Sequence, residues 1–330
     1  MEAKLAAEIP AGDGWQFEPK WDGFRCLAFR DGDEVALMSK SGKPLGRYFP
    51  EIVAALRDLK QTRFVLDGEL VLPRGEILSF ADLQLRLHPA ASRIEKLSRE
   101  SPAQLLLFDA LQLGKRDLAD EPLNRRRDAL AAFMARAAGP RLLLSPATAE
   151  RDVAERWFAN TGGALDGIVA KRLDQPYQPG ERAMIKVKQQ RTADCVVGGY
   201  RLSGDTVGSL LLGLYDAGGK LNYVGFTSSF DAAARAALLD KLKPLHGEPA
   251  FTGNAPGGPS RWSRGKSTEW VALKPELIAE VVYDQVTGQR FRHGTTFLRW
   301  RPDKAPRQCT MEQLEHELRP AALAEFMTPA

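Results

Sequence analysis

The spacing of apolar residues changes near residue 190, and this change constrains the fold of the 330-residue chain more than any other feature. Before residue 190, alternating segments typical of strands are separated by longer segments with apolar residues at helical spacing. After it, short alternating segments dominate, and one helical segment, 231–242, interrupts them. We therefore expect two domains, residues 1–190 and 191–330, each large enough to bury a core of its own.

The first domain is expected to combine antiparallel strands with helices. Residues 24–40 alternate around the turn Asp31-Gly32, which predicts a hairpin directly after Lys20. A helix that starts beside Pro50 is expected at 49–60, followed by a strand at 63–72. The remaining predicted elements are strands at 105–111, 165–171 and 184–189, and helices at 122–138 and 149–160.

The second domain is expected to be rich in short strands. About five strands with one intervening helix are typical of a small Greek-key barrel of the OB type, a common platform for nucleic acids. The predicted strands are 195–202, 209–215, 221–227, 270–273 and 278–285.

Composition excludes several classes of protein. Apolar runs such as 105–108 and 210–212 are far shorter than the roughly 20 residues of a membrane span, and the first residues carry no apolar signal core. We therefore expect a cytoplasmic protein. Cys26, Cys195 and Cys309 form no Cys-x-x-Cys pair, so a disulfide framework and a zinc ribbon are both excluded.

Basic residues cluster locally, although the net charge is only +4. The segment 290–307 contains six Lys or Arg residues and one acidic residue. Clustered cations suit contact with a phosphate backbone. The residues predicted to bind DNA are Arg261, Arg264, Lys266, Arg290 and Arg292.

The segment Lys20-Trp21-Asp22-Gly23-Phe24-Arg25 indicates covalent nucleotidyl transfer, because Lys171, Lys186 and Lys188 follow it in short apolar segments. A lysine amine can attack the α-phosphorus of a nucleotide only when it is unprotonated. Neighbouring cations or desolvation lower the pKa of a lysine, and the same cations neutralise phosphate charge.

With this motif, the chain resembles the ATP-dependent DNA ligases, in particular the small two-domain bacterial ligase C type. The resemblance covers nearly the full length and implies a nucleotidyltransferase domain followed by an OB-fold domain. Six further motifs follow the first in the family's order: Ser39-Lys40-Ser41-Gly42, Leu66-Asp67-Gly68-Glu69-Leu70, Leu107-Phe108-Asp109, Asp166-Gly167-Ile168-Val169-Ala170-Lys171, Ile185-Lys186-Val187-Lys188 and Arg301-Pro302-Asp303-Lys304.

The resemblance assigns roles to individual residues. Lys20 would carry AMP, with Asp22 and Arg25 as further catalytic residues, and Asp166 and Glu69 would hold Mg²⁺ or Mn²⁺. Asp166 stands where the family usually has glutamate, and Lys40 where it usually has arginine. The residues expected to bind ATP are Glu18 (adenine amino group), Phe108 (adenine ring), Lys20, Arg25, Lys40, Glu69, Lys186, Lys188, Arg301 and Lys304, the last two at the pyrophosphate.

The expected reaction is the sealing of 5′-phosphate/3′-hydroxyl nicks in double-stranded DNA through a lysyl-AMP intermediate, in DNA repair. A primase-polymerase or an end-joining factor is a candidate partner by the same resemblance. We also expect a monomer that associates with the nucleoid when it is bound to DNA. Three alternatives stay open: an RNA ligase, a GTP-dependent capping enzyme, and a catalytically inactive OB protein that binds nucleic acid. The absence of a Cys cluster argues against an NAD-dependent ligase.

Overall fold

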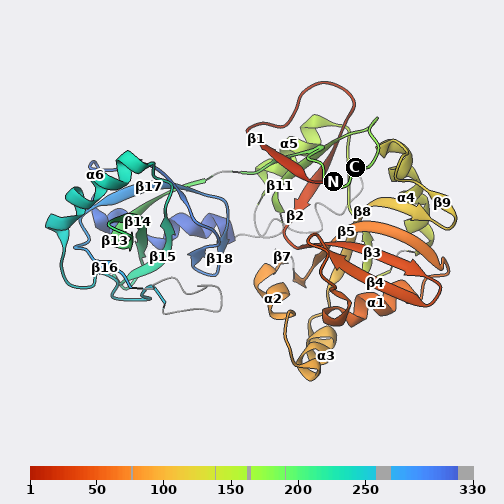
Figure 1. The fold of residues 1–330 in the computed structure, drawn as a ribbon, viewed down its shortest axis with the longest axis horizontal. Helices are drawn as coiled ribbons and strands as arrows, with labels where there is room; N and C mark the ends of the chain where they lie inside the picture. Colours follow the sequence, from red (N-terminus) through yellow and green to blue (C-terminus); the bar gives the residue numbers. More distant parts are fainter. Residues whose placement is uncertain (76, 138, 162–164, 190, 258–268, 319–330) are drawn as a thin grey trace. The chain divides into compact units, whose positions relative to one another are not determined.

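The computed structural model describes every residue except 76, 138, 162–164, 190, 258–268 and 319–330. The chain divides into two compact units, Met1–Gln189 and Gln190–Arg319, which Figure 1 shows in different colours along the sequence. Within the described residues, no helix is both long enough and apolar enough to cross a membrane. The three cysteines are buried and free.

The N-terminal unit contains two main sheets (Figure 1). The smaller sheet has the order β1 (Ala3–Ala6), β12 (Met184–Val187), β11 (Leu165–Arg172), β2 (Trp15–Trp21). The larger sheet has the order β10 (Leu142–Leu144), β8 (Gln104–Leu113), β5 (Arg63–Val71), β3 (Phe24–Asp31), β4 (Glu34–Ser39), with β9 (Arg116–Asp117) paired to β8. The predicted hairpin is confirmed as β3 and β4.

Helices cover one face of the larger sheet. Helices α1 (Pro50–Arg57) and α4 (Leu123–Ala137) bury Leu56 and Leu130 against strand residues such as Leu66. Because successive strand residues point to opposite faces, Asp67 and Glu69 lie on the other face, together with Arg25 of β3. Helix α5 (Arg151–Ala159) packs instead on the smaller sheet.

Some elements of this unit were not predicted. Two strand pairs, β1–β12 and β10–β8, are parallel. The short helices α2 (Phe80–Leu85) and α3 (Ala91–Glu100) lie in a stretch to which the sequence assigned no structure. The other short elements are η1 (Gly46–Tyr48), β6 (Pro73–Arg74) and β7 (Ile77–Leu78).

The second unit is a strongly bent antiparallel sheet with the order β15 (Leu221–Thr227), β14 (Thr206–Tyr215), β13 (Arg191–Ser203), β17 (Ile278–Tyr283), β20 (Thr296–Trp300). The backbone N–H of Thr295 donates to Phe226 across 3.0 Å, so the two edge strands meet. This closure gives the barrel that the sequence predicts. The remaining elements are α6 (Ala232–Leu242), β16 (Val271–Ala272), β18 (Val286–Thr287), β19 (Arg290–Phe291), η2 (Lys243–Leu245), η3 (Pro306–Gln308) and η4 (Met311–Leu318).

Candidate active site

Lys20 lies where the chain passes from one sheet to the other. Strand β2 of the smaller sheet ends at Trp21, and β3 of the larger sheet begins at Phe24. A Cβ atom on Gly23 would lie 2.2 Å from the carbonyl oxygen of Leu70, far inside a normal contact. The close approach of β5 therefore requires glycine at position 23.

Asp166 connects two of the predicted lysines. Its Oδ2 atom lies 2.5 Å from Nζ of Lys20 and 3.0 Å from Nζ of Lys188. The Asp166 side chain is only 5% exposed. Asp166 sits on an irregularity in β11, followed by Gly167 with φ of +141°, a conformation that residues with a side chain rarely adopt. The bulge aims the carboxylate at both amines.

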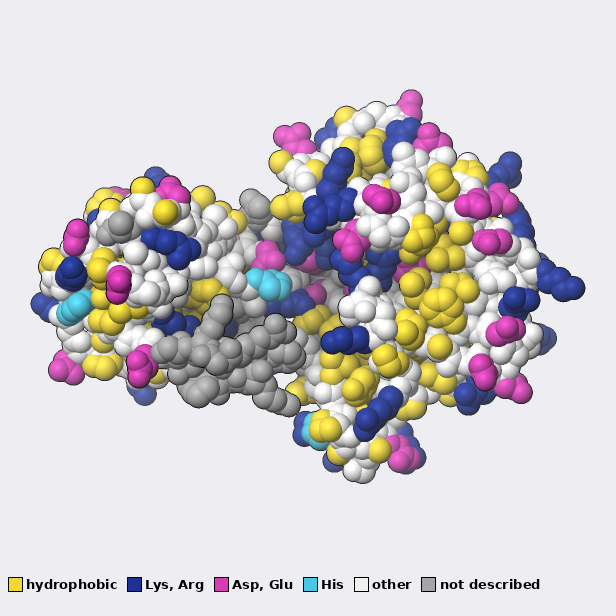
Figure 2. Space-filling view, viewed as in Figure 1, with side chains coloured by type: hydrophobic (Ala, Val, Ile, Leu, Met, Phe, Trp, Pro, Cys, Tyr) yellow, Lys and Arg dark blue, Asp and Glu magenta, His cyan; other side chains and the backbone are white. Residues whose placement is uncertain are grey.

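The other predicted cations gather around this pair. Lys186 lies on β12, and its pKa is lowered by desolvation and then by the positive charges of Lys188, Lys20 and Lys40. Lys40 follows β4 and pairs with Glu2 at 3.2 Å, with most of its side chain exposed. Figure 2 shows Lys and Arg side chains gathered on the visible face of the N-terminal unit. The site can therefore neutralise a polyphosphate.

Glu18 and Phe108 are joined by Lys171. The Lys171 ammonium lies 2.7 Å from Oε2 of Glu18 and 4.4 Å from the centroid of the Phe108 ring. Glu18 also accepts a hydrogen bond from Gln16 at 2.7 Å, and both Glu18 and Lys171 are buried. The sequence grouped Lys171 with Lys186 and Lys188 as cations that neutralise phosphate charge, whereas in the structure its ammonium lies between Glu18 and Phe108.

Arg25 is held by a network that the sequence did not predict. Its guanidinium donates to both carboxylate oxygens of Asp67, at 3.1 and 2.6 Å, and to the Met1 carbonyl. The Tyr177 hydroxyl donates to Asp67 at 3.0 Å and lies 3.2 Å from Arg25. Burial alone would lower the pKa of Arg25, but the Asp67 carboxylate overrides it and raises this pKa. Arg25 is thus fixed by the protein itself.

Glu69 lines a cavity of about 920 Å³, and the positive charge of Lys20 acts on its carboxyl group. Desolvation raises the pKa of Glu69 to about 8, against the opposing effects of Lys20 and Arg25. The apolar part of the lining includes Tyr48 and Leu87. Other lining residues include Gly23, Phe24, Arg25 and Lys40.

The residues present fit a metal ion that arrives with phosphate. Among the described residues, no three His, Cys, Asp or Glu side chains group closely enough to hold a metal ion. Mg²⁺ commonly takes only one or two protein carboxylates and completes its shell with water and phosphate oxygens. Asp166 can supply one such carboxylate, and Glu69 is available nearby once it is ionised.

Arg301 and Lys304 lie in the second unit, directly after β20. Both contact Asp194 of β13: Arg301 Nη1 lies 2.9 Å from Oδ1, and Lys304 Nζ lies 2.5 Å from Oδ2. Arg301 also donates to Asp303. The sequence did not single out Asp194.

The predicted DNA-binding residues are described only in part. Arg290 lies over the Tyr223 ring, 5.3 Å from its centroid, and Arg292 donates to Gln285 at 2.6 Å. Arg261, Arg264 and Lys266 lie outside the described residues.

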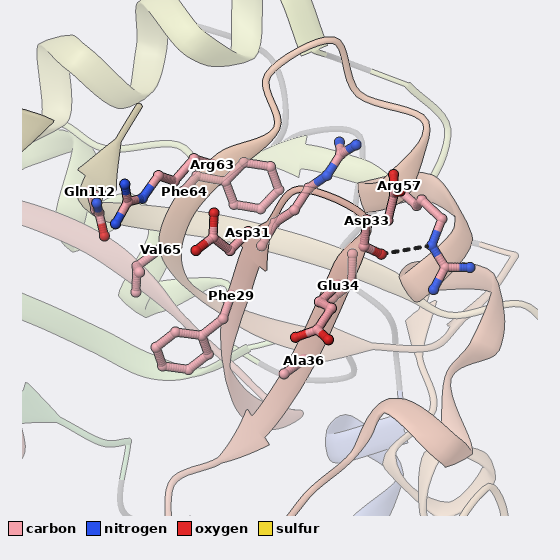
Figure 3. A pocket seen from close by; sticks show the side chains of 12 residues that line it. Phe29, Asp31, Asp33, Glu34, Ala36, Arg57, Arg63, Phe64, Val65 and Gln112 are labelled. Carbon is pink, nitrogen blue, oxygen red and sulfur yellow. Dashed lines mark hydrogen bonds between the residues drawn. The ribbon is translucent and has the colours of Figure 1, made fainter. Parts of the chain in front are cut away.

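A second cavity, of about 570 Å³, lies at the turn of the β3–β4 hairpin (Figure 3). Phe29, Asp31 and Arg63 line it, and Arg57 donates to the Asp33 carbonyl at its rim. Asp31 is six residues beyond Arg25, which is about 20 Å along a strand. This cavity is therefore separate from the cluster around Lys20.

Comparison with known proteins shows which family shares this sequence and fold. Residues 3–188 match the family described as "ATP dependent DNA ligase domain", and residues 203–304 match "ATP dependent DNA ligase C terminal region". DNA ligase C1 of Mycolicibacterium smegmatis is 48% identical, over 96% of this chain and 94% of that protein. The Mycobacterium tuberculosis protein named "Multifunctional non-homologous end joining DNA repair protein LigD" is 31% identical, over 90% of this chain and 37% of that protein.

A solved structure of a Lig E DNA ligase has the same fold. It superimposes with a TM-score of 0.57 at 17% identity and covers 91% of this chain and 99% of that one. The expected fold class, a nucleotidyltransferase domain followed by an OB-fold domain, is confirmed. With both family regions matched and 48% identity across nearly its whole length, the chain belongs to the ATP-dependent DNA ligases.

Proposed function

We propose that the chain seals nicks in double-stranded DNA that carry a 5′-phosphate and a 3′-hydroxyl, using ATP and a lysyl-AMP intermediate on Lys20. The environment of the Lys20 amine is the observation that carries this proposal. Oδ2 of Asp166 lies 2.5 Å from the Lys20 amine, and Nζ of Lys188 lies 3.0 Å from the same oxygen. A nucleophile is thereby fixed next to a cation that can neutralise the phosphate it attacks.

In the first step, Lys20 Nζ releases a proton to Asp166 Oδ2, which lies 2.5 Å away, and forms a bond to the α-phosphorus of ATP, while the bond to the bridging oxygen breaks so that pyrophosphate leaves. Lys186 and Lys188 neutralise the charge on the α-phosphate. Arg301 and Lys304 are assigned to the departing pyrophosphate. Positioning and charge neutralisation account for most of the catalysis in such reactions.

Adenine is assigned to Glu18 and Phe108. Both Glu18 oxygens already accept a hydrogen bond, but a carboxylate has about four acceptor positions and can also accept from an amino group. Lys171 lies against the Phe108 ring, so adenine stacking requires the opposite face of the ring or a shift of Lys171.

In the later steps, the DNA 5′-phosphate takes AMP from Lys20, and the 3′-hydroxyl then displaces AMP from the DNA. Lys40 and the cavity beside Glu69 are the assigned location of the nick. Because Arg25 is bound to Asp67 and Tyr177, its assigned role is to shape this cavity as well as to contact phosphate. Mg²⁺, held by Asp166 and Glu69, would supply further neutralisation of phosphate charge.

A role in DNA repair is proposed from the similarity to LigD, whose name includes end joining. The candidate partners are a primase-polymerase or an end-joining factor. Phosphate contacts by Arg290 and Arg292 are assigned to the duplex flanking the nick.

The test is the transfer of label from α-labelled ATP or GTP to the protein in the presence of Mg²⁺, followed by a chase with nicked DNA or nicked RNA. The wild-type chain should be labelled by ATP, and the label should move to DNA. Lys20→Ala should abolish labelling, whereas Lys4→Ala, which removes an exposed lysine of β1, should leave it unchanged. Labelling that persists in Lys20→Ala, or that prefers GTP, would refute the proposal.

A further inference from the structure

Two cations of the second unit converge on one carboxylate. After β20, the backbone N–H of Arg301 donates to the Ile278 carbonyl at 2.9 Å, and the N–H of Lys304 donates to the Arg301 carbonyl at 3.3 Å. This turn brings both side chains to Asp194, with Arg301 Nη1 at 2.9 Å from Oδ1 and Lys304 Nζ at 2.5 Å from Oδ2. The turn fixes the backbone of Arg301 and Lys304 but not the conformations of their long side chains.

Asp194 is itself firmly placed. It lies on β13, opposite Glu280 of β17, and its side chain is 11% exposed. The Gln313 side chain binds its backbone twice: Oε1 accepts from the Asp194 N–H at 2.9 Å, and Nε2 donates to the Asp194 carbonyl at 3.1 Å. The carboxylate is therefore a fixed point to which two flexible side chains are bound.

The other carboxylate partners of Arg301 differ from Asp194. Asp303 is 60% exposed and lies two residues from Arg301, within the same turn. Glu280 lies 3.5 Å from Arg301 and 2.6 Å from Arg299. In the described part of the chain, Asp194 is the carboxylate seen in contact with both Arg301 and Lys304. It leaves two of the three N–H groups of the partly exposed Lys304 ammonium for another anion.

We propose that Asp194 is a positioning residue that orients Arg301 and Lys304 for the pyrophosphate portion of ATP during adenylation of the enzyme. Long cationic side chains lose rotamer freedom when they bind an anion. Asp194 restricts that freedom before ATP arrives, and its negative charge offsets the repulsion between the two cations. This inference rests on the proposed role of Arg301 and Lys304.

The experiment separates the first step from the later ones. Adenylation is measured over a range of ATP concentrations, and sealing is measured without ATP on a nick that already carries 5′-AMP. Asp194→Asn retains the size of the side chain, and Asp194→Ala removes it. We expect kcat/KM for adenylation to fall by about 100-fold in Asp194→Ala and less in Asp194→Asn, with sealing of pre-adenylated DNA unchanged. The matched control is Asp216→Asn, in a turn of the same unit, which contacts Lys220 and Asn222 and should change neither step.

A coupling measurement tests whether Asp194 acts through the two cations. When Arg301 and Lys304 are both alanine, addition of Asp194→Asn should cost almost nothing further, because its effect requires them. Additive losses would overturn the proposal, as would unchanged adenylation in Asp194→Ala or equal loss of both steps in Asp194→Asn with an unchanged melting temperature. If the Arg301/Lys304 double variant itself adenylates normally, the proposed pyrophosphate role fails. If the double variant loses adenylation but the Asp194 variants adenylate normally, only the proposed positioning role of Asp194 fails.

Discussion

Loss of the buried ion pair between Asp109 and Arg126 should strongly destabilise the N-terminal unit. Arg126 of α4 is 0% exposed and donates to both carboxylate oxygens of Asp109, at 2.9 and 3.0 Å. It also donates to the carbonyls of Glu121 and Gln175. Arg126→Met leaves a buried carboxylate without its cation, which costs about 3–5 kcal/mol.

The expected shift in melting temperature follows from the size of the unit. For the 189 residues of Met1–Gln189, the entropy of unfolding is about 0.4 kcal/mol per degree, so a loss of 3–5 kcal/mol lowers the transition by roughly 8–12 °C. Differential scanning calorimetry of the whole chain can follow this transition separately from that of the second unit. Denaturant unfolding gives the free energy independently.

Two controls make the measurement decisive. Arg126→Met combined with Asp109→Leu removes both charges and should recover most of the lost free energy, because a buried ion pair often contributes little against apolar residues of similar size. Arg151→Ala breaks an exposed pair with Glu155 and should cost less than about 1 kcal/mol. A loss of under about 1 kcal/mol in the free energy of unfolding of Arg126→Met would contradict this prediction. So would a double variant that is no more stable than the single one.

Three further outcomes are expected. Gly23→Ala should lower the melting temperature and abolish adenylation, since its Cβ would lie 2.2 Å from the Leu70 carbonyl oxygen; a stable, active variant would contradict this. The raised pKa of Glu69 means that the folded state keeps a proton that the unfolded state loses, so its contribution to stability is present below about pH 4.5 and is lost as pH rises through about 8. Glu69→Gln should flatten the melting temperature as a function of pH between 5 and 9, and an unchanged profile would count against the assigned pKa. Alanine at Arg290 and Arg292 should weaken nick binding and reduce the slope of log K against log salt by about 2 without affecting adenylation, as gel-shift titrations can test.

The sequence predicted the charged residues at the centre of the site better than the residues that hold them in place. Lys20, Asp166 and Lys188 belong to motifs whose residue types suggest phosphate chemistry, and the structure brings them together. Tyr177 lies in a loop between β11 and β12, where no local pattern reveals that its hydroxyl reaches Asp67. Contacts between residues 110 positions apart depend on the tertiary fold, which periodicity does not encode.

Two of the missed residues nevertheless carried a signal. Asp67 lies in a strand between Leu66 and Leu70, and an acidic residue inside an apolar strand requires a buried partner. Arg126 lies on the same helical stripe as Leu130 and Met134, the face that packs into the core. A charged residue in such a position predicts an ion pair, although it does not identify the partner.

The limits of the fold prediction have a similar cause. Hairpin β3–β4 was predicted because its register is local and its turn contains Asp31-Gly32. The parallel pairs β1–β12 and β10–β8 join short strands that are distant in sequence, and the second strand of each pair has no turn signal that connects it to the first. Helix α2 has only six residues, too few for a periodic pattern to be recognised.

Three of the motifs shared with the ligases contain an Asp-Gly pair, and the glycine of each pair determines how closely two strands approach. Each lies beside a residue of the site, and at each a Cβ would come within 2.0–2.7 Å of a carbonyl oxygen on a neighbouring strand. The contacts are Gly23 with Leu70, Gly68 with Leu106 and Gly167 with Val187. These glycines therefore set the distance between strands that carry Lys20, Glu69, Asp166 and Lys188. A chain that keeps the charged residues but loses these glycines should separate the strands and, with them, the groups that must meet at one phosphate.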